Sequence, residues 1–125
     1  MSLAPVIDLG ALLRPIAEDA PQGSDIRADL APTSVYYTLK DARNRARAAE
    51  RAALFDSDGI DTFGDWQQVL ALAPQILADT SKDLEVASWL LESLIRIHGL
   101  AGLRDGLELN RRLVETHWDG LFPTP

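Results

Sequence analysis

The sequence lacks cysteine altogether and contains only two histidines, His98 and His117. Without a thiol the chain has no disulfide framework, no thiolate zinc site, no iron–sulfur cluster and no cysteine nucleophile. Neither histidine belongs to the His-x-x-x-His or His-x-x-Glu spacing that holds zinc on a helix. Both fall near the predicted ends of helices, where an imidazolium interacts favourably with the helix dipole. We therefore predict no catalytic, metal-binding or cofactor-binding residues.

Long apolar runs and targeting signals are also missing. The most apolar region, residues 86–97, is interrupted by Ser88, Glu92, Ser93 and Arg96, so it falls short of the roughly 18 consecutive apolar residues of a membrane span. The first residues lack the basic start and apolar core of a signal peptide. These absences predict a cytoplasmic domain with no direct membrane insertion.

Basic residues are outnumbered, with 12 Lys and Arg against 19 Asp and Glu and a net charge of −7. An acidic domain is a poor default binder of nucleic acid or of an anionic membrane. The basic residues are almost all arginine, with only Lys40 and Lys82 as lysines. The planar guanidinium favours defined, bidentate contacts.

The pattern of apolar residues predicts an all-α fold, a compact bundle of about five helices with an irregular N-terminal wrapping arm. A short helix and the arm occupy residues 1–32 and belong to the same domain as the helical bundle of residues 33–120. Residues 121–125 have the composition of a linker. We expect helices at about 8–14, 33–54, 65–79, 81–98 and 101–118.

Several residues predict where these helices begin and end. Asp8 and Asp65 are expected N-caps, with Gln68 completing a capping box after Asp65, and the helix between them is expected to begin near Thr33 or Ser34. Thr80 or Ser81 is the expected cap of the next helix, and Gly99 is expected to end it. Pro74 removes an amide donor and crowds the carbonyl of Leu70, so we expect a kink or a new start there.

Small residues predict where helices pack closely. Leu39, Ala42, Ala46, Ala49 and Ala53 form a narrow stripe along one predicted helix. Gly102 and Gly106 are unfavourable inside a helix by about 1 kcal/mol each, and their spacing would allow close backbone packing against the preceding helix. The three tryptophans, Trp66, Trp89 and Trp118, lie on apolar stripes and are predicted to be in the core.

Three aspartates, Asp56, Asp58 and Asp61, lie in one predicted loop. The loop lacks the twelve-residue ligand pattern and the closing glutamate of an EF-hand, so a solvated turn is the favoured interpretation.

The candidate partner-binding residues are Arg43, Arg47 and Arg51, which recur at every fourth position of a predicted helix. The row is consistent with a solvated helix face, with a docking patch for an acidic protein, or with a phosphate-tracking surface that uses Tyr36 and Tyr37 for stacking. The net charge disfavours nucleic acid. In the arm, Asp25 and Arg27 either pair with helix ends or shape a groove for a partner.

Five segments in a fixed order resemble a known family. They are PIAEDAPQGSDIR at 15–27, KDAR at 40–43 followed by Arg47 and Glu50, the pair Asp65-Trp66, SKDLEVASWL at 81–90 with HGLAGLRDGL at 98–107, and WDGLFP at 118–123. Together they resemble the N-terminal domain of TssA (ImpA-type) proteins of bacterial type VI secretion systems. Gln22 departs from the pattern, because a small residue or cysteine is expected there.

The resemblance implies a non-enzymatic assembly factor whose partners are baseplate, sheath or inner-tube proteins of the secretion machine. It also implies that C-terminal regions absent from this chain form a homo-oligomeric ring, and that the domain acts where the apparatus meets the inner membrane and the sheath end. The family-motif residues are expected to be mainly structural: Asp25, Arg27, Trp66, Lys82, Asp83, Leu84, Trp89, Gly99, Gly102, Gly106, Trp118 and Asp119. The alternative is a regulatory or small-ligand-binding helical domain that uses the arm as a lid over a pocket lined by Asp25, Arg27 and a tryptophan.

Overall fold

The computed structural model describes residues 4–55 and 62–124, so the loop aspartates Asp56, Asp58 and Asp61 lie outside the described residues. The elements in chain order are α1 (Leu9–Leu13), the 3-10 turn η1 (Ile26–Ala28), α2 (Val35–Ala53), α3 (Phe63–Asp79), α4 (Leu84–His117) and the 3-10 turn η2 (Trp118–Gly120). Within the described ranges there is no strand, only two isolated bridges, which pair Gly23 with Ser81 and Asp83 with Phe122. The predicted all-α class is confirmed.

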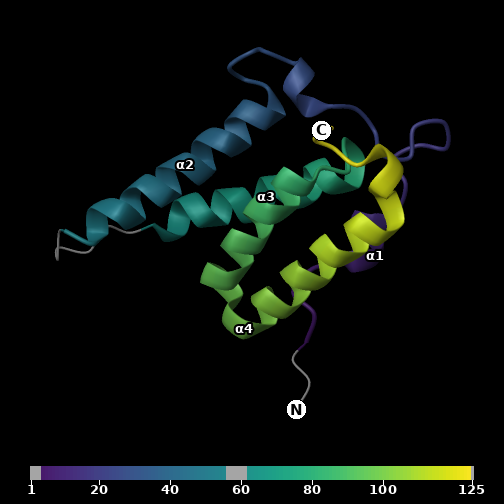
Figure 1. The fold of residues 1–125 in the computed structure, drawn as a ribbon. Helices are drawn as coiled ribbons and strands as arrows, with labels where there is room; N and C mark the ends of the chain where they lie inside the picture. The colour runs from purple at the N-terminus through teal and green to yellow at the C-terminus, as the bar shows by residue number, and fades with distance from the viewer. Residues whose placement is uncertain (1–3, 56–61, 125) are drawn as a thin grey trace.

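The predicted number of about five helices is not exactly matched, because the described residues form four α-helices. The two helices expected on either side of Gly99 are assigned as the single element α4. Gly99 nevertheless has non-helical angles, φ 60° and ψ −131°, and this left-handed conformation suits a residue without Cβ. The chain turns back on itself there, so α4 is a hairpin of two antiparallel arms (Figure 1).

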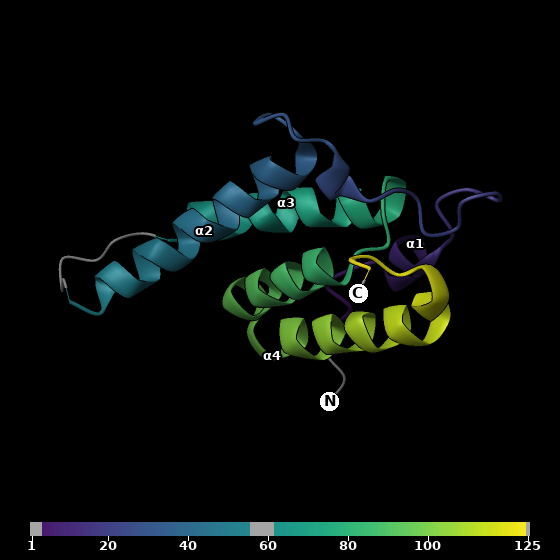
Figure 2. The same cartoon turned by 45° about the horizontal axis from the view of Figure 1, so that its top comes forward.

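Helix α3 lies between α2 and the α4 hairpin and packs against both (Figures 1 and 2). Helix α1 contacts α3 and α4, and η1 contacts α2. Leu39, Ala42 and Ala46 of α2 are fully buried, as the small-residue stripe predicts. The core is completed by aliphatic side chains that have no exposed surface: Val69 and Leu77 of α3 and Val86, Leu90, Leu94, Leu109 and Leu113 of α4.

Two of the three tryptophans occupy this core. Trp66 is 1% exposed and Trp89 is 8% exposed, whereas Trp118 is 69% exposed, so its predicted core position is wrong. Trp118 belongs to η2, past the end of the helical periodicity on which the prediction was based. It lines a surface groove with Leu84, Phe122 and Pro123.

The helix boundaries confirm some predicted caps and correct others. Asp8 and Ser34 accept hydrogen bonds at the starts of α1 and α2. Helix α3 begins after Thr62, which places Asp65 in its first turn rather than at the N-cap. The N-cap of α4 is Asp83, whose carboxylate accepts from the amide of Val86, and not Thr80 or Ser81. Pro74 starts no new helix, because α3 continues through it to Asp79.

Gly102 and Gly106 permit the close approach of the two α4 arms. A Cβ on Gly102 would overlap the backbone carbonyl of Leu94, and one on Gly106 would overlap the side chain of Leu91. The predicted close packing is therefore confirmed, and it explains why two residues of poor helix propensity occupy the middle of a helix.

Gly102→Ala should lower the free energy of unfolding by about 2 kcal/mol, because the added methyl group meets backbone atoms that cannot rotate away. Gly64→Ala is the matched control: nothing lies near its Cβ position in the first turn of α3, and alanine has the better helix propensity. Urea unfolding should show a loss for the first variant and no loss for the second. Equal stabilities would mean that the arms can separate without cost.

Candidate functional site

The family-motif residues of the arm and of the start of α4 meet around the guanidinium of Arg27. Its two terminal nitrogens donate to both carboxylate oxygens of Asp83 at 2.6 and 3.1 Å. They also donate to Asp25 at 3.1 Å and to Glu85 at 2.8 Å. The guanidinium stands over the ring of Tyr36 with 4.9 Å between Cζ and the centroid. We call Asp25, Arg27, Tyr36, Asp83 and Glu85 the Arg27 cluster.

Each member of the Arg27 cluster also fixes backbone or a neighbour. Asp25 caps η1 by accepting from the amide of Arg27, and Asp83 caps α4. Tyr36 of α2 donates its hydroxyl to Glu85 at 2.9 Å. Burial and this bond to Glu85 raise the pKa of the Tyr36 hydroxyl. Burial alone would lower the pKa of Arg27, but the bonds to Asp83 and Glu85 outweigh it and raise that pKa. The cluster joins the arm, α2 and α4.

Residues 80–84 run between the arm and the C-terminal segment. Lys82 donates its backbone amide to Gln22 at 2.8 Å, and Ser24 donates to Thr80 at 3.2 Å. On the other side Phe122 donates to Lys82 at 3.0 Å, and Leu84 donates to Phe122 at 2.7 Å. Three of the five segments that carry the family resemblance therefore contact one another here. Phe122 lies in residues 121–125, which are predicted to begin a linker, but its backbone is hydrogen-bonded to the domain.

The side chain of Lys82, in the middle of residues 80–84, is fully buried. Its ammonium donates to the carbonyl of Leu12 at 2.7 Å and to that of Leu77, so one charge serves the C-terminal ends of α1 and α3. Helix C-termini carry partial negative charge and favour a cation. Burial, with repulsion from Arg14 as a smaller cause, lowers the pKa of Lys82 to about 8.

His117 has a structural position that the sequence did not reveal. It is 3% exposed, its Nε2 bonds the carbonyl of Leu13 at 2.8 Å, and its Nδ1 bonds the side-chain amide of Gln22 at 3.0 Å. Since Gln22 offers an N–H to Nδ1, the assigned tautomer carries its proton on Nε2. His117 thereby holds the end of α4 to α1 and the arm. Its partner Gln22 is a departure from the family pattern, and the sequence indicates no role for it.

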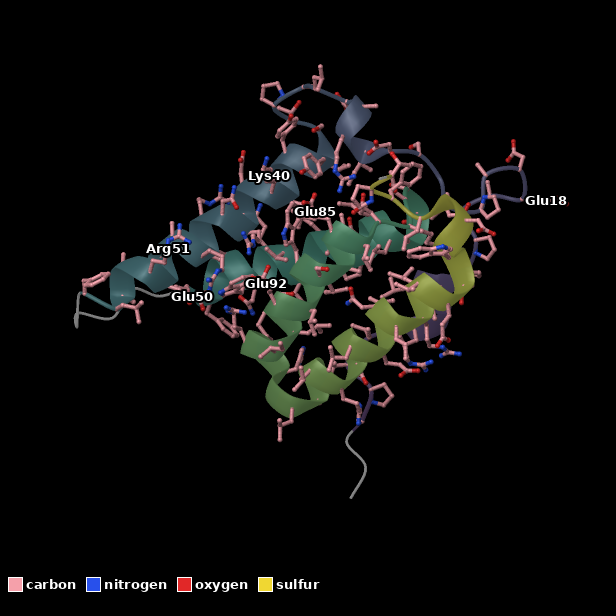
Figure 3. All side chains as sticks on the ribbon, in the orientation of Figure 1. Glu18, Lys40, Glu50, Arg51, Glu85 and Glu92 are labelled. Atoms are coloured by element: carbon pink, nitrogen blue, oxygen red, sulfur yellow. The ribbon has the colours of Figure 1, made fainter. Side chains whose placement is uncertain are left out.

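The arginine row of α2 is largely engaged inside the domain. Arg43 forms a two-pronged pair with Glu92 of α4 at 2.9 and 3.1 Å. Arg47 pairs with Glu50 at 3.1 Å, and Glu50 also accepts from Arg96 at 2.7 Å. The bonds to Arg96 and Arg47 lower the pKa of Glu50 despite its partial burial. Figure 3 shows Glu50 of α2 and Glu92 of α4 where the two helices face each other.

Arg51 differs from the other two arginines of the row. It is exposed, and no ion pair joins it to another side chain in residues 4–55 or 62–124 (Figure 3). Arg45, on the adjacent face, pairs with Asp65 at 3.4 Å and bonds Gln68 at 3.0 Å. Partner binding by the row stays a prediction, and Arg51 is its one member with a free guanidinium in the described structure.

The pocket required by the small-ligand alternative is not formed where it was expected. The guanidinium of Arg27 is paired with three carboxylates and stands over Tyr36, while Trp89 packs beside Tyr36 with 5.9 Å between ring centroids. Asp25 and Arg27 thus bond to each other and to α4, and Trp89 lies in the core next to them. In the part of the chain that is described, no group of three or more His, Asp or Glu residues is placed to hold a metal ion. Nor do these residues include a helix long and apolar enough to span a membrane.

The fold and the Arg27 cluster define an all-helical domain in which an N-terminal arm and a C-terminal segment are tied to the start of a helical hairpin. The chain belongs to the family described as ImpA, N-terminal, type VI secretion system, whose model matches residues 13–125. It is 33% identical over 118 residues to the type VI secretion system component TssA1 of Pseudomonas aeruginosa.

A solved structure agrees with this assignment. The N-terminal domain that includes the conserved ImpA_N region of the TssA component from Burkholderia cenocepacia superimposes with a TM-score of 0.73 at 29% identity, covering 99% of this chain and 44% of that one. The match to the Pseudomonas protein covers 94% of this chain but only 32% of the relative, so the chain spans about a third of the relative's length.

Proposed function

We propose that this domain is a non-catalytic docking module of a TssA-like protein and binds other components of the type VI secretion machine. Its partners are baseplate, sheath or inner-tube proteins, and the parent protein assembles into a homo-oligomer through regions outside this chain. The site of action is the cytoplasmic apparatus near the inner membrane and the sheath end. Family membership supports the assignment to the type VI secretion system. The arrangement of the polar groups supports the docking role.

The main observation behind the proposal is that the motif residues form their hydrogen bonds within the domain. Arg27, Asp83 and Lys82 bond to groups of the domain itself, and these bonds join the arm, α1, α3 and α4. Residues that bond one another rigidify a fold, and they leave recognition to the outer surface of the helices. Rigid binding surfaces lose little freedom on association, which favours docking.

Arg51 is the contact residue we propose on α2, with an acidic surface as its partner. The other two arginines of the row are partly neutralised by Glu92 and Glu50, so their reversal would disturb the domain as well as any interface. A single reversal at Arg51 tests binding without that complication.

Arg51→Glu should weaken co-purification with the acidic partner among the baseplate, sheath and inner-tube proteins by about tenfold, or about 1.4 kcal/mol. Loss of an interface ion pair and its replacement by repulsion account for that size. Arg112→Glu, which reverses a half-exposed arginine on α4, is the matched control and should bind like the wild type. If Arg51→Glu retains all three classes of partner normally, the contact assignment is wrong. If the wild-type domain retains none of them, the docking role itself is wrong.

A further inference from the structure

An apolar groove lies between α1 and α3, on a surface separate from the arginine row. One wall consists of Val6, Ile7 and Ala11, and the other of Leu70, Pro74 and Ala78. The volume of the groove is about 410 Å³, enough for a few aliphatic side chains. All six wall residues are partly exposed, so the surface is accessible.

Pro74 contributes an apolar ring to this groove beside Leu70. Because proline has no amide hydrogen, it cannot donate the helical bond to the carbonyl of Leu70, four residues earlier. The backbone bonding of α3 is therefore interrupted along the wall of the groove.

Polar contacts fix the elements that form the walls, one part-buried at Val6 and one buried at Lys82. The amide of Val6 donates to the carboxylate of Asp105 in α4 at 2.8 Å, and Arg104 holds the other oxygen of that carboxylate at 2.7 Å. At the other end of α1, Lys82 bonds the carbonyls of Leu12 and Leu77 and so ties α1 to α3. The groove is thus held open by the fold, which lowers the cost of binding.

The charges at the groove are of one sign. The two charged residues among its lining are Asp8 and Asp79, one from each wall, and both are exposed. Asp8 also caps α1, where its carboxylate accepts from the amide of Ala11 at 3.1 Å. Carboxylates that flank an apolar groove attract lysine or arginine at the edges of a bound apolar segment and disfavour acidic ones.

We propose that this groove binds an amphipathic helix of another secretion-machine component, with aliphatic side chains in the groove and lysine or arginine against Asp8 and Asp79. A groove between two helices matches the helix-in-groove mode of recognition, in which residues at i, i+3, i+4 and i+7 supply the anchors. The inference rests on the proposed docking role and adds the chemistry of the partner. It uses a different surface from Arg51, so separate variants test the two.

The probe is an array of overlapping synthetic peptides of about 20 residues that tile the baseplate, sheath and inner-tube proteins of the same gene cluster. The domain should retain basic-flanked amphipathic peptides that become helical on binding, as measured by circular dichroism. Ala78→Phe, which fills the groove, should weaken the best peptide at least about tenfold by fluorescence anisotropy. Ala48→Phe places the same side chain on an exposed position of α2 and should bind normally.

A charge variant keeps the test independent of packing. Asp79→Lys changes an exposed residue and should weaken binding about threefold to tenfold, with the difference vanishing in about 1 M salt, where the screening length is ~3 Å. Asp41→Lys, on exposed α2 surface, is its control. Equal affinities for both members of each variant pair, or an array that retains only acidic or non-helical peptides, would overturn the groove proposal. Peptide binding that ignores Ala78→Phe but is lost in Arg51→Glu would overturn the groove while supporting the arginine site.

Discussion

Arg27→Ala should lower the free energy of unfolding by about 3–5 kcal/mol. The expected loss is large because the carboxylate of Asp83 is fully buried and would lose its two-pronged partner. Glu85 would lose an ion pair at the same time, and Tyr36 would lose the cation that covers its ring. Urea unfolding followed by tryptophan fluorescence measures the change directly. With a loss of stability this large, the arm should separate from the start of α4.

Three variants separate this explanation from a general effect of removing arginine. Arg111→Ala removes a cation with two surface partners, Glu108 and Glu115, and should cost far less than Arg27→Ala, because solvent screens exposed ion pairs. Arg27→Lys keeps the charge but cannot form the planar fork, so it should fall between the wild type and Arg27→Ala. Adding Asp83→Asn to Arg27→Ala should recover part of the loss, because asparagine still caps a helix and carries no buried charge. A loss for Arg27→Ala no larger than that for Arg111→Ala would show that the Arg27 cluster contributes little.

The features that the sequence predicts well are those that depend on neighbours along the chain. Asp8 and Ser34 cap helices because the cap needs only amides two or three residues ahead. Gly102 and Gly106 predict close packing because their spacing places both on one helix face. The two arms of α4 were expected as separate helices, because a glycine often ends a helix. A glycine is equally compatible with a sharp turn inside one element, as at Gly99.

The features that the sequence predicts poorly depend on segments distant along the chain. His117 and Gln22 are 95 positions apart, and nothing local in either indicates their bond. Asp65 has the composition of a cap, yet α3 begins earlier at Phe63 and Asp65 pairs with Arg45 of α2. Trp118 continues an apolar stripe in the sequence, but η2 changes the rotation per residue and points it to the surface.

The candidate site shows the same division. The spacing of Arg43, Arg47 and Arg51 predicts that they lie along one helix face. Glu92, which accepts from Arg43, belongs to α4, and the sequence does not indicate it as a partner. Asp25 and Arg27 were expected either to pair with helix ends or to shape a groove. The Arg27 cluster corresponds to the first of these interpretations, because its carboxylates cap η1 and α4.

Lys82 makes the stability of the domain depend on pH in the alkaline range. The pKa of its amine is about 8 in the folded chain, against 10.5 in the unfolded chain. Between these values the unfolded state binds more protons than the folded state, so the free energy of unfolding rises with pH. The pKa difference of 2.5 corresponds to about 3 kcal/mol at most. The neutral amine still has two N–H groups, which suffice for Leu12 and Leu77.

Comparison with Lys82→Met isolates this contribution, because methionine fills similar volume and does not titrate. The contributions of other ionisable groups are common to both proteins and cancel in the difference. The stability of the wild type relative to Lys82→Met should increase by about 2–3 kcal/mol between pH 7 and pH 10.5, measured by urea unfolding across the range. The ¹³C shift of the Lys82 Cε should titrate with a midpoint of about 8. A difference that stays flat with pH, or that falls, would mean that the ammonium is better solvated in the folded domain than its burial between α1 and α3 implies. In that case Lys82 would hold the two helices as a permanent cation rather than as a group close to neutrality.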